Sequence, residues 1–151
     1  MKLSTKGRYG LRLMIDIGVY SKKQPVSLKS ISSRLSISES YLEQLTAKLK
    51  KHKLVISKRG AKGGYILAKD AKDISVGDIL RALEGSLAPT DCTGENEMSD
   101  CMVSCGVDRN CVTKSVWEKM RDGINNVVDS INLLELVDEY EQNDIDYIKE
   151  I

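Results

Sequence analysis

Residues 54–68 read Leu-Val-Ile-Ser-Lys-Arg-Gly-Ala-Lys-Gly-Gly-Tyr-Ile-Leu-Ala. Two apolar runs that favour β-strands flank a tip rich in glycine and positive charge. The tip glycines allow the positive φ angles that a tight hairpin requires, and they are Gly60, Gly63 and Gly64. The tip cations are Lys58, Arg59 and Lys62. A basic tip fits the narrow, negative minor groove of DNA, so the stretch predicts the wing of a winged helix, with an ordinary solvated hairpin as the alternative.

Three amphipathic helices are expected before this hairpin. The first runs from Thr5 to about Lys22, and its apolar positions are Leu11, Met14, Ile15, Gly18 and Val19. Ser27 is the expected N-cap of a short second helix, whose inner face is Leu28, Ile31 and Leu35 and whose outer face is Lys29, Ser33 and Arg34. Ser38 is the expected N-cap of a third, with Leu42, Leu45 and Leu49 inside. This order is typical of a helix-turn-helix, and helices that serve only as a core scaffold are the alternative.

The outward face of the third helix mixes hydroxyl, carboxylate, amide and cationic groups: Glu39, Ser40, Glu43, Gln44, Lys48 and Lys51. Such a mixture suits contact with base edges and phosphates, whereas a purely solvated face usually carries Lys and Glu throughout. Tyr41 lies at the edge of the apolar face. We therefore expect a mainly α protein with a small β-hairpin wing, in which this helix contacts double-stranded DNA.

Charge divides the chain into two unlike parts. Residues 1–70 hold sixteen Lys and Arg against four Asp and Glu, a net charge of +12, while residues 71–151 hold seven against eighteen, a net charge of −11. The basic half is expected to face a polyanion. The start has no apolar run typical of a signal peptide and no later stretch could cross a bilayer, so we expect a cytoplasmic protein without membrane contact. An enzyme is the least favoured class, because the chain has one histidine and no nucleophile–base or phosphate-loop motif.

The second half begins with a capping box, Ser75 to Asp78, that opens a fourth helix ending at Gly85. From Thr113 to about Leu136 the chain has its longest amphipathic helix, with apolar positions Val116, Trp117, Met120, Ile124, Val127, Val128, Ile131 and Leu134. A second copy of the chain would cover this stripe, although the helix could instead fold back on its own chain. We therefore divide the chain into a winged helix-turn-helix at 1–85, a cysteine-bearing loop at 86–112, a dimerisation helix at 113–137 and an acidic, partly mobile tail at 138–151.

All four cysteines lie in or beside that loop: Cys92, Cys101, Cys105 and Cys111. No CxxC pair occurs, which argues against a zinc ribbon or a thioredoxin-type motif. Thiolates are soft ligands that suit an iron–sulfur cluster, and a polar, glycine-containing loop could wrap one. Zinc, a thiol–disulfide switch and inert thiols are the alternatives.

Four stretches together closely resemble the Rrf2 family of bacterial winged-helix regulators. They are Met-Lys-Leu-Ser-Thr-Lys-Gly-Arg-Tyr-Gly at the start, Ser-Tyr-Leu-Glu-Gln-Leu at 40–45, the wing, and Val-Gly-Asp-Ile at 76–79. The resemblance covers residues 1 to about 137. The cysteine positions resemble the family's regulators of iron–sulfur cluster assembly, because Cys92 follows the fourth helix and Cys105 and Cys111 precede Val-Thr-Lys-Ser-Val-Trp.

This resemblance implies a homodimer that binds pseudo-palindromic promoter DNA and is expected to act as a repressor of genes for iron–sulfur cluster assembly or for cysteine and sulfur metabolism. It implies that the third helix faces the major groove through Ser38, Ser40, Glu43 and Gln44, and that Arg59 and Gly60 enter the minor groove. We add Tyr41 and Lys48 to this expected DNA surface.

The resemblance also implies a two-iron, two-sulfide cluster held by three cysteines and by a histidine three residues after the last of them. Lys114 stands at that position here, and the only histidine, His52, lies at the end of the third helix. Cys101 is the expected replacement, which gives the metal ligands Cys92, Cys101, Cys105 and Cys111. Two relatives remain alternatives: a nitric-oxide sensor with a different cluster, and a cysteine-metabolism repressor that has the fold without a cluster. An electron-transfer or cluster-delivery protein is the alternative from another class.

Overall fold

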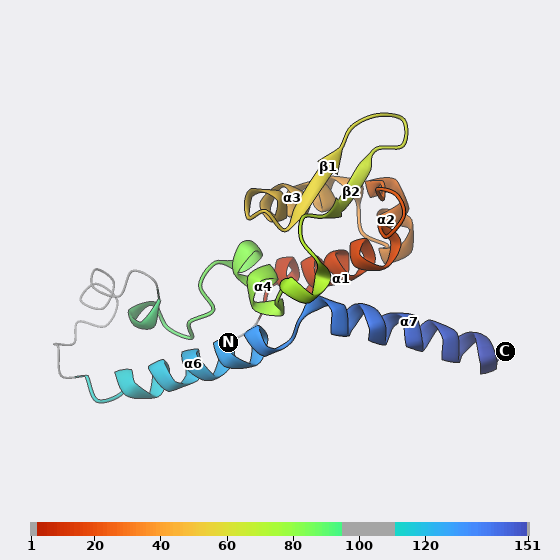
Figure 1. Ribbon diagram of the computed structural model, residues 1–151. Helices are drawn as coiled ribbons and strands as arrows, with labels where there is room; N and C mark the ends of the chain where they lie inside the picture. The colour runs from red at the N-terminus through yellow and green to blue at the C-terminus, as the bar shows by residue number, and fades with distance from the viewer. Residues whose placement is uncertain (1–2, 95–110, 151) are drawn as a thin grey trace.

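The computed structural model describes residues 3–94 and 111–150, with side chains in the second range described as far as residue 144. In chain order its elements are α1 (Thr5–Tyr20), α2 (Leu28–Leu35), α3 (Glu39–Lys51), β1 (Val55–Lys58), β2 (Gly64–Leu67), the 3-10 turn η1 (Ala71–Asp73), α4 (Val76–Glu84), the 3-10 turn η2 (Asp91–Thr93), α6 (Lys114–Ser130) and α7 (Leu133–Glu150). Figure 1 shows α2, α3 and the hairpin on one side of α1, with α6 and α7 along the opposite side. The predicted mainly α winged helix-turn-helix is confirmed.

Serine side chains begin the helices of the N-terminal half. The Ser4, Ser27 and Ser38 hydroxyls accept hydrogen bonds from backbone N–H groups in the first turns of α1, α2 and α3. Ser75 and Asp78 form the predicted capping box of α4, and Gly85 ends that helix with a φ of +86°. The second, third and fourth helices therefore begin where the sequence predicts, because each start depends on a local contact.

The hairpin is antiparallel, with Val55 opposite Leu67 and Lys58 opposite Gly64. Gly60 and Gly64 have positive φ angles of 116° and 156°. We expected Gly63 to provide a positive φ angle, and this was wrong, because Gly63 is not among the residues with positive φ. It is needed for close approach instead: a Cβ at Gly63 would lie 2.5 Å from the Lys58 carbonyl oxygen.

α1 lies within the core. Its buried residues are not confined to the inner face that the sequence predicts. Leu13, Met14 and Ile17 are completely buried, whereas the predicted Leu11, Ile15 and Val19 are only partly buried. The reason is that α1 packs against several elements at once, with α4 and α7 as its main neighbours. A helix buried on several sides has no single apolar stripe for the sequence to reveal.

The predicted single helix from Thr113 to about Leu136 is instead two helices that meet at Ile131 and Asn132. The Val76 N–H donates to the Ile131 carbonyl at 2.9 Å, and the Leu133 N–H donates to the Ile74 carbonyl at 2.8 Å. These hydrogen bonds hold the connection in an extended form against the start of α4. The Asn132 side chain then accepts a hydrogen bond from the Glu135 N–H at 3.0 Å, as an N-cap does.

The acidic segment from Asp138 was predicted to be a partly mobile tail, but it belongs to α7, which continues to Glu150. The helix is anchored on α1, because Leu133 and Val137 lie in the main core. A hydrogen bond with Tyr20 is the main cause that raises the pKa of Tyr140 to about 12. Within the described residues, no helix is long and apolar enough to cross a membrane.

Candidate functional site

The outward face of α3 carries the residues predicted to contact base edges. Ser38, Ser40, Glu43 and Gln44 are all exposed. The Ser38 hydroxyl accepts a hydrogen bond from the Tyr41 N–H at 3.4 Å and lies 3.5 Å from the Ser40 hydroxyl. This face therefore offers hydrogen-bonding groups at the start of a helix, where the backbone dipole also favours an anion.

Tyr41 is half-buried and joins the start of α3 to the start of α1. Its hydroxyl lies 3.3 Å from the Thr5 hydroxyl. Its ring meets the Tyr9 ring edge to face, with the ring centroids 6.1 Å apart. Tyr41 is thus positioned by α1, which the sequence pattern did not indicate.

Lys48 is the predicted site residue whose surroundings differ most from the expectation of an open phosphate contact. It is exposed, yet its Nζ donates a hydrogen bond to the Leu83 carbonyl at 3.3 Å. Leu83 belongs to the last turn of α4, whose carbonyl groups have no donor within the helix. The ammonium group therefore contacts the negative end of the α4 dipole.

The tip of the wing is open to solvent. Arg59 and Gly60 are exposed, as are Lys58 and Lys62. The start of β2, next to the tip, is held against the chain before α2, because Val26 and Tyr65 exchange backbone hydrogen bonds of 3.0 and 2.8 Å. A Cβ at Gly64 would lie 2.4 Å from the Val26 carbonyl oxygen. The tip cations are therefore presented on a hairpin whose second strand is fixed at its start.

An ion pair inside the helix-turn-helix was missed at the sequence level, where Arg34 was placed on a solvated face. Arg34 Nε and Nη2 donate to the two carboxylate oxygens of Asp16, both at 2.7 Å. The side chain of Asp16 is only 4% exposed, and the Arg34 guanidinium stacks 4.1 Å from the centre of the Tyr20 ring. The hydrogen bonds that Arg34 donates to Asp16 are the main cause that raises the pKa of Arg34. An acidic residue among the apolar positions of α1, between Met14 and Ile17, was the signal for this pair.

Glu84, in the last turn of α4, connects to the start of α1. Its Oε1 accepts hydrogen bonds from the Ser4 N–H at 3.1 Å, the Ser4 hydroxyl at 2.6 Å and the Gly7 N–H at 2.8 Å. A Cβ at Gly7 would lie 2.7 Å from this oxygen, and one at Gly10 would lie 1.9 Å from the Leu83 side chain. The serine and glycines of the opening motif are thus explained by contact with α4.

The cysteine site lies partly outside the described residues, which include Cys92 and Cys111 but not Cys101 and Cys105. Cys92 is buried, and its sulfur lies 3.3 Å from the Thr90 hydroxyl. Hydrogen bonds with Thr113 lower the pKa of the Cys111 thiol. Among the described residues, no group of three or more His, Cys, Asp or Glu side chains could hold a metal ion. The predicted ligand set is therefore neither assembled nor excluded by these residues.

The segment around Cys92 is fixed to α6, because Arg121 Nη1 donates to the Thr93 carbonyl at 3.2 Å. Lys114, at the start of α6, lies 3.8 Å from Glu118 Oε1.

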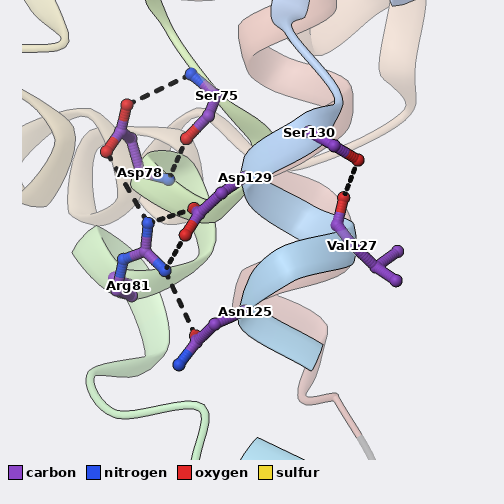
Figure 2. A network of polar contacts seen from close by, with 7 residues as sticks. All are labelled: Ser75, Asp78, Arg81, Asn125, Val127, Asp129 and Ser130. Atoms are coloured by element: carbon purple, nitrogen blue, oxygen red, sulfur yellow. Dashed lines mark hydrogen bonds and ion pairs between the residues drawn. The ribbon is translucent and has the colours of Figure 1, made fainter. Parts of the chain in front are cut away.

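Two contacts hold α4 to α6. Arg81 of α4 forms an ion pair with Asp129 of α6 and donates to Asn125 Oδ1 at 3.3 Å, as Figure 2 shows. Ile124 and Val128 of α6 pack against the buried Val76 and Leu80 of α4. One face of α6 is therefore occupied by its own chain.

A second face of α6 is apolar and is not covered by the residues that the structure describes. Val116, Met120 and Val127 are 48%, 44% and 60% exposed and lie at helical spacing on one stripe. Met120, Gly123 and Val127 help to line a shallow, almost wholly apolar hollow on this stripe. Isolated exposed apolar residues are common, but a continuous stripe is typical of an interface.

Comparison with known proteins agrees with these features. The model of the Rrf2 family, described as an iron-dependent transcriptional regulator, matches residues 3–139. The HTH-type transcriptional regulator IscR of Serratia proteamaculans is 42% identical over 137 residues, which cover 91% of this chain and 79% of the relative. The solved structure of T. potens IscR has 46% identity, a TM-score of 0.74 and coverage of 95% of this chain and 90% of its own. The structure of CymR, the global cysteine regulator of B. subtilis, has 38% identity, the same TM-score and coverage of 92% and 98%.

Proposed function

We propose the function of this chain from one premise: it belongs to the Rrf2 family of transcriptional regulators. The chain is a homodimer that binds pseudo-palindromic promoter DNA through its winged helix-turn-helix. Its cysteines hold an iron–sulfur cluster, so that DNA binding reports the supply of clusters in the cytoplasm. The observation that carries this proposal is the presence, on one winged helix-turn-helix, of an exposed polar face on α3 and an exposed basic wing tip.

The proposed DNA surface consists of Ser38, Ser40, Tyr41, Glu43, Gln44, Lys48, Arg59 and Gly60. On α3, the hydroxyl and amide groups suit base edges, and Glu43 could accept a hydrogen bond from cytosine N4 but is repelled by nearby phosphate. The wing cations suit the minor groove, where a narrow A·T-rich segment concentrates negative potential. Among these residues, Glu43 is therefore expected to make DNA affinity depend most strongly on the base sequence.

The proposed homodimer rests on α6. Val116, Met120 and Val127 expose a stripe that the chain's own core does not cover. A two-fold partner would cover the same stripe on both copies and place two α3 helices on successive turns of one face of DNA. Such a dimer explains why an amphipathic helix keeps apolar residues on two faces.

The proposed cluster ligands are Cys92, Cys101, Cys105 and Cys111. Soft thiolates fit iron, and a buried Cys92 fits a site that limits contact with water. When bound, a two-iron, two-sulfide cluster would supply a group whose presence depends on iron, sulfide and oxidants. Four thiolates carry more negative charge than three thiolates and a histidine, so a low reduction potential is expected. The chain's own residues respond to cluster binding at the thiols by changing the position of the DNA-binding surface.

A cysteine-responsive repressor without a cluster is the second candidate. It is favoured by the similarity to CymR and by Lys114, which replaces the histidine expected from the family resemblance. In this alternative the same dimer and DNA surface are kept, while the thiols themselves, or a partner protein, receive the signal.

The DNA-binding proposal is tested by fluorescence anisotropy with a duplex taken from the region upstream of the chain's own gene. The affinity of the parent should exceed that for a scrambled duplex and should fall as salt is raised. Arg59→Ala should cost about 1 to 3 kcal/mol on the specific duplex.

Lys69→Ala is the matched control, because it removes an exposed cation beyond the wing strands. If Arg59→Ala bound as tightly as the parent, the wing would have no place in recognition. If the parent did not distinguish the two duplexes, an electron-transfer or cluster-delivery role would be favoured instead.

A further inference from the structure

The last turn of α4 lies between the DNA-binding unit and residues 86–94, which contain Cys92 and are called the cysteine segment below. α4 ends at Glu84, and the chain then reaches Cys92 in the turn Asp91–Thr93. Leu87, between them, is buried against Val76 and Leu80. The connection is short and packed, so a change in the position of Cys92 would act on the end of α4.

Glu84 ties this turn to the start of α1. Three hydrogen bonds from Ser4 and Gly7 end on one carboxylate oxygen, at 2.6 to 3.1 Å. Two of the donors are backbone N–H groups near the positive end of the α1 dipole, which an anion stabilises. Lys6 is the further charged group beside this carboxylate.

Lys48 ties the same turn to the second half of α3 through its hydrogen bond to the Leu83 carbonyl. The first turn of α3 is in turn attached to α1, because Tyr41 contacts Thr5 and Tyr9. α3 is therefore attached near both ends to elements that meet at Leu83 and Glu84. Because rigid secondary elements carry coupling, a movement of those points would change the position of α3 as a whole.

We propose that Leu83 and Glu84 form a junction that passes the state of the cysteine segment to α3, with Glu84 and Lys48 as positioning residues. The inference rests on the proposed function and names the contacts through which its regulation acts. A movement of Glu84 reaches the start of α3 through α1. A movement of Leu83 reaches the later turns of α3 directly, through Lys48. Lys48 thus serves regulation through α4 in addition to any contact with phosphate.

The test compares DNA affinity in two states of the full chain: protein loaded with iron and sulfide under anaerobic conditions, and protein from which iron has been removed. The parent is expected to show an affinity ratio of about fivefold or more between the states, a usual size for coupling between two sites. Glu84→Ala and Lys48→Met should each reduce this ratio to below about twofold. Glu84→Gln, which keeps an acceptor oxygen, should restore most of it.

Two matched variants distinguish a loss of coupling between the two sites from a general effect of removing a charge. Lys51→Met removes a cation one turn further along α3, so it should weaken DNA binding in both states by the same factor and leave the ratio unchanged. Asp73→Ala removes an exposed carboxylate away from the junction and should change neither affinity nor ratio. If Glu84→Ala and Lys48→Met also kept the parent's ratio, the junction would be refuted.

A second measurement tests the proposed junction even if the chain holds no cluster. Amide hydrogen exchange of iron-free protein should be faster in α3 of Glu84→Ala than in the parent by about threefold or more, with α2 as the internal reference. Equal exchange in α3, or the same increase in α2, would overturn the inference. Failure of the proposed function has a different signature: the parent takes up no iron, or its two states bind DNA equally.

Discussion

α1 and α6 are helices of nearly equal length with opposite relations to the core. α1 has 16 residues, seven of which are buried, including Asp16 and three glycines. α6 has 17 residues, all of them described, and none is buried. Both sequences are amphipathic, so the difference arises from the neighbours that the fold supplies. Neighbouring elements bury much of α1, while α6 keeps an apolar stripe that the described residues, 3–94 and 111–150, leave exposed.

This difference assigns separate tasks to the two helices. α1 is the fixed support on which α2, α3, α4 and the wing are positioned. α6 touches α4 and the turn that holds Cys92, but Val116, Met120 and Val127 on its other face are exposed. Substitutions in α1 should therefore act on folding, whereas substitutions on the exposed stripe of α6 should act on association.

The largest effect is expected at Asp16 of α1. Arg34→Met leaves the Asp16 carboxylate, whose side chain is only 4% exposed, without its bidentate partner, and the free energy of unfolding should fall by about 3 to 5 kcal/mol. Urea denaturation followed by circular dichroism measures this change. The control is Asp129→Ala in α6, whose ion pair with Arg81 is much more exposed and should contribute about 1 kcal/mol or less. Equal losses in the two variants would remove the distinction between the helices.

A glycine in each helix gives the next comparison. Gly10→Ala places a Cβ 1.9 Å from the Leu83 side chain, so repacking of α1 against α4 should cost about 1 to 3 kcal/mol. Gly123→Ala in α6 meets nothing within 4 Å, and better helix propensity should stabilise the monomer by about 0.5 to 1 kcal/mol. Both are measured in the background of Val127→Lys, so that association does not contribute. Two changes of the same sign would contradict the comparison.

Val127→Lys tests the exposed stripe directly. A charge at a position that is 60% exposed in the single chain should leave the stability of the monomer within about 0.5 kcal/mol of the parent. Burial of that charge between two copies should weaken the dimer by about tenfold or more, which is about 1.4 kcal/mol. Sedimentation over a range of protein concentrations measures this. Asn126→Lys, an exposed position about 100° round the helix from Val127, is the control, and an unchanged dimer in Val127→Lys would show that α6 is not the interface.

The smallest effect concerns pH and the contact of α1 with α4. Partial burial raises the pKa of Glu84, but the hydrogen bonds from Ser4 and Gly7 and the charge of Lys6 outweigh it, so the pKa is lowered from 4.5. A carboxyl group with a lowered pKa stabilises the folded state above the unfolded pKa, and this contribution is lost as pH falls through the folded value. Glu84→Gln should therefore flatten the decline in stability below about pH 4.5. An unchanged pH profile between the parent and the variant would contradict this role of Glu84.

The parts predicted well from the sequence are those that local chemistry decides. Ser27, Ser38 and Ser75 begin helices through contacts within one turn, and Gly60 and Gly64 permit the hairpin backbone. The helix order and the wing follow from such signals.

The parts missed depend on contacts distant in sequence. The break at Ile131 and Asn132 is made by hydrogen bonds to Ile74 and Val76, which the periodicity of the later helix could not reveal. The pairing of Arg34 with Asp16 and of Lys48 with Leu83 likewise joins different helices. At the candidate site, the sequence indicated which α3 and wing residues are exposed but not which elements hold them in place.

The most direct test of cluster sensing is the iron and acid-labile sulfide content per chain of protein purified without oxygen, for the parent and for each Cys→Ala variant. We expect equal amounts of iron and sulfide in the parent and a loss on replacement of Cys92, Cys105 or Cys111. The Cys101 variant decides whether that residue is the fourth ligand. Colourless, iron-free protein that cannot be reconstituted would contradict the cluster and would leave a thiol-responsive repressor with the same DNA-binding unit.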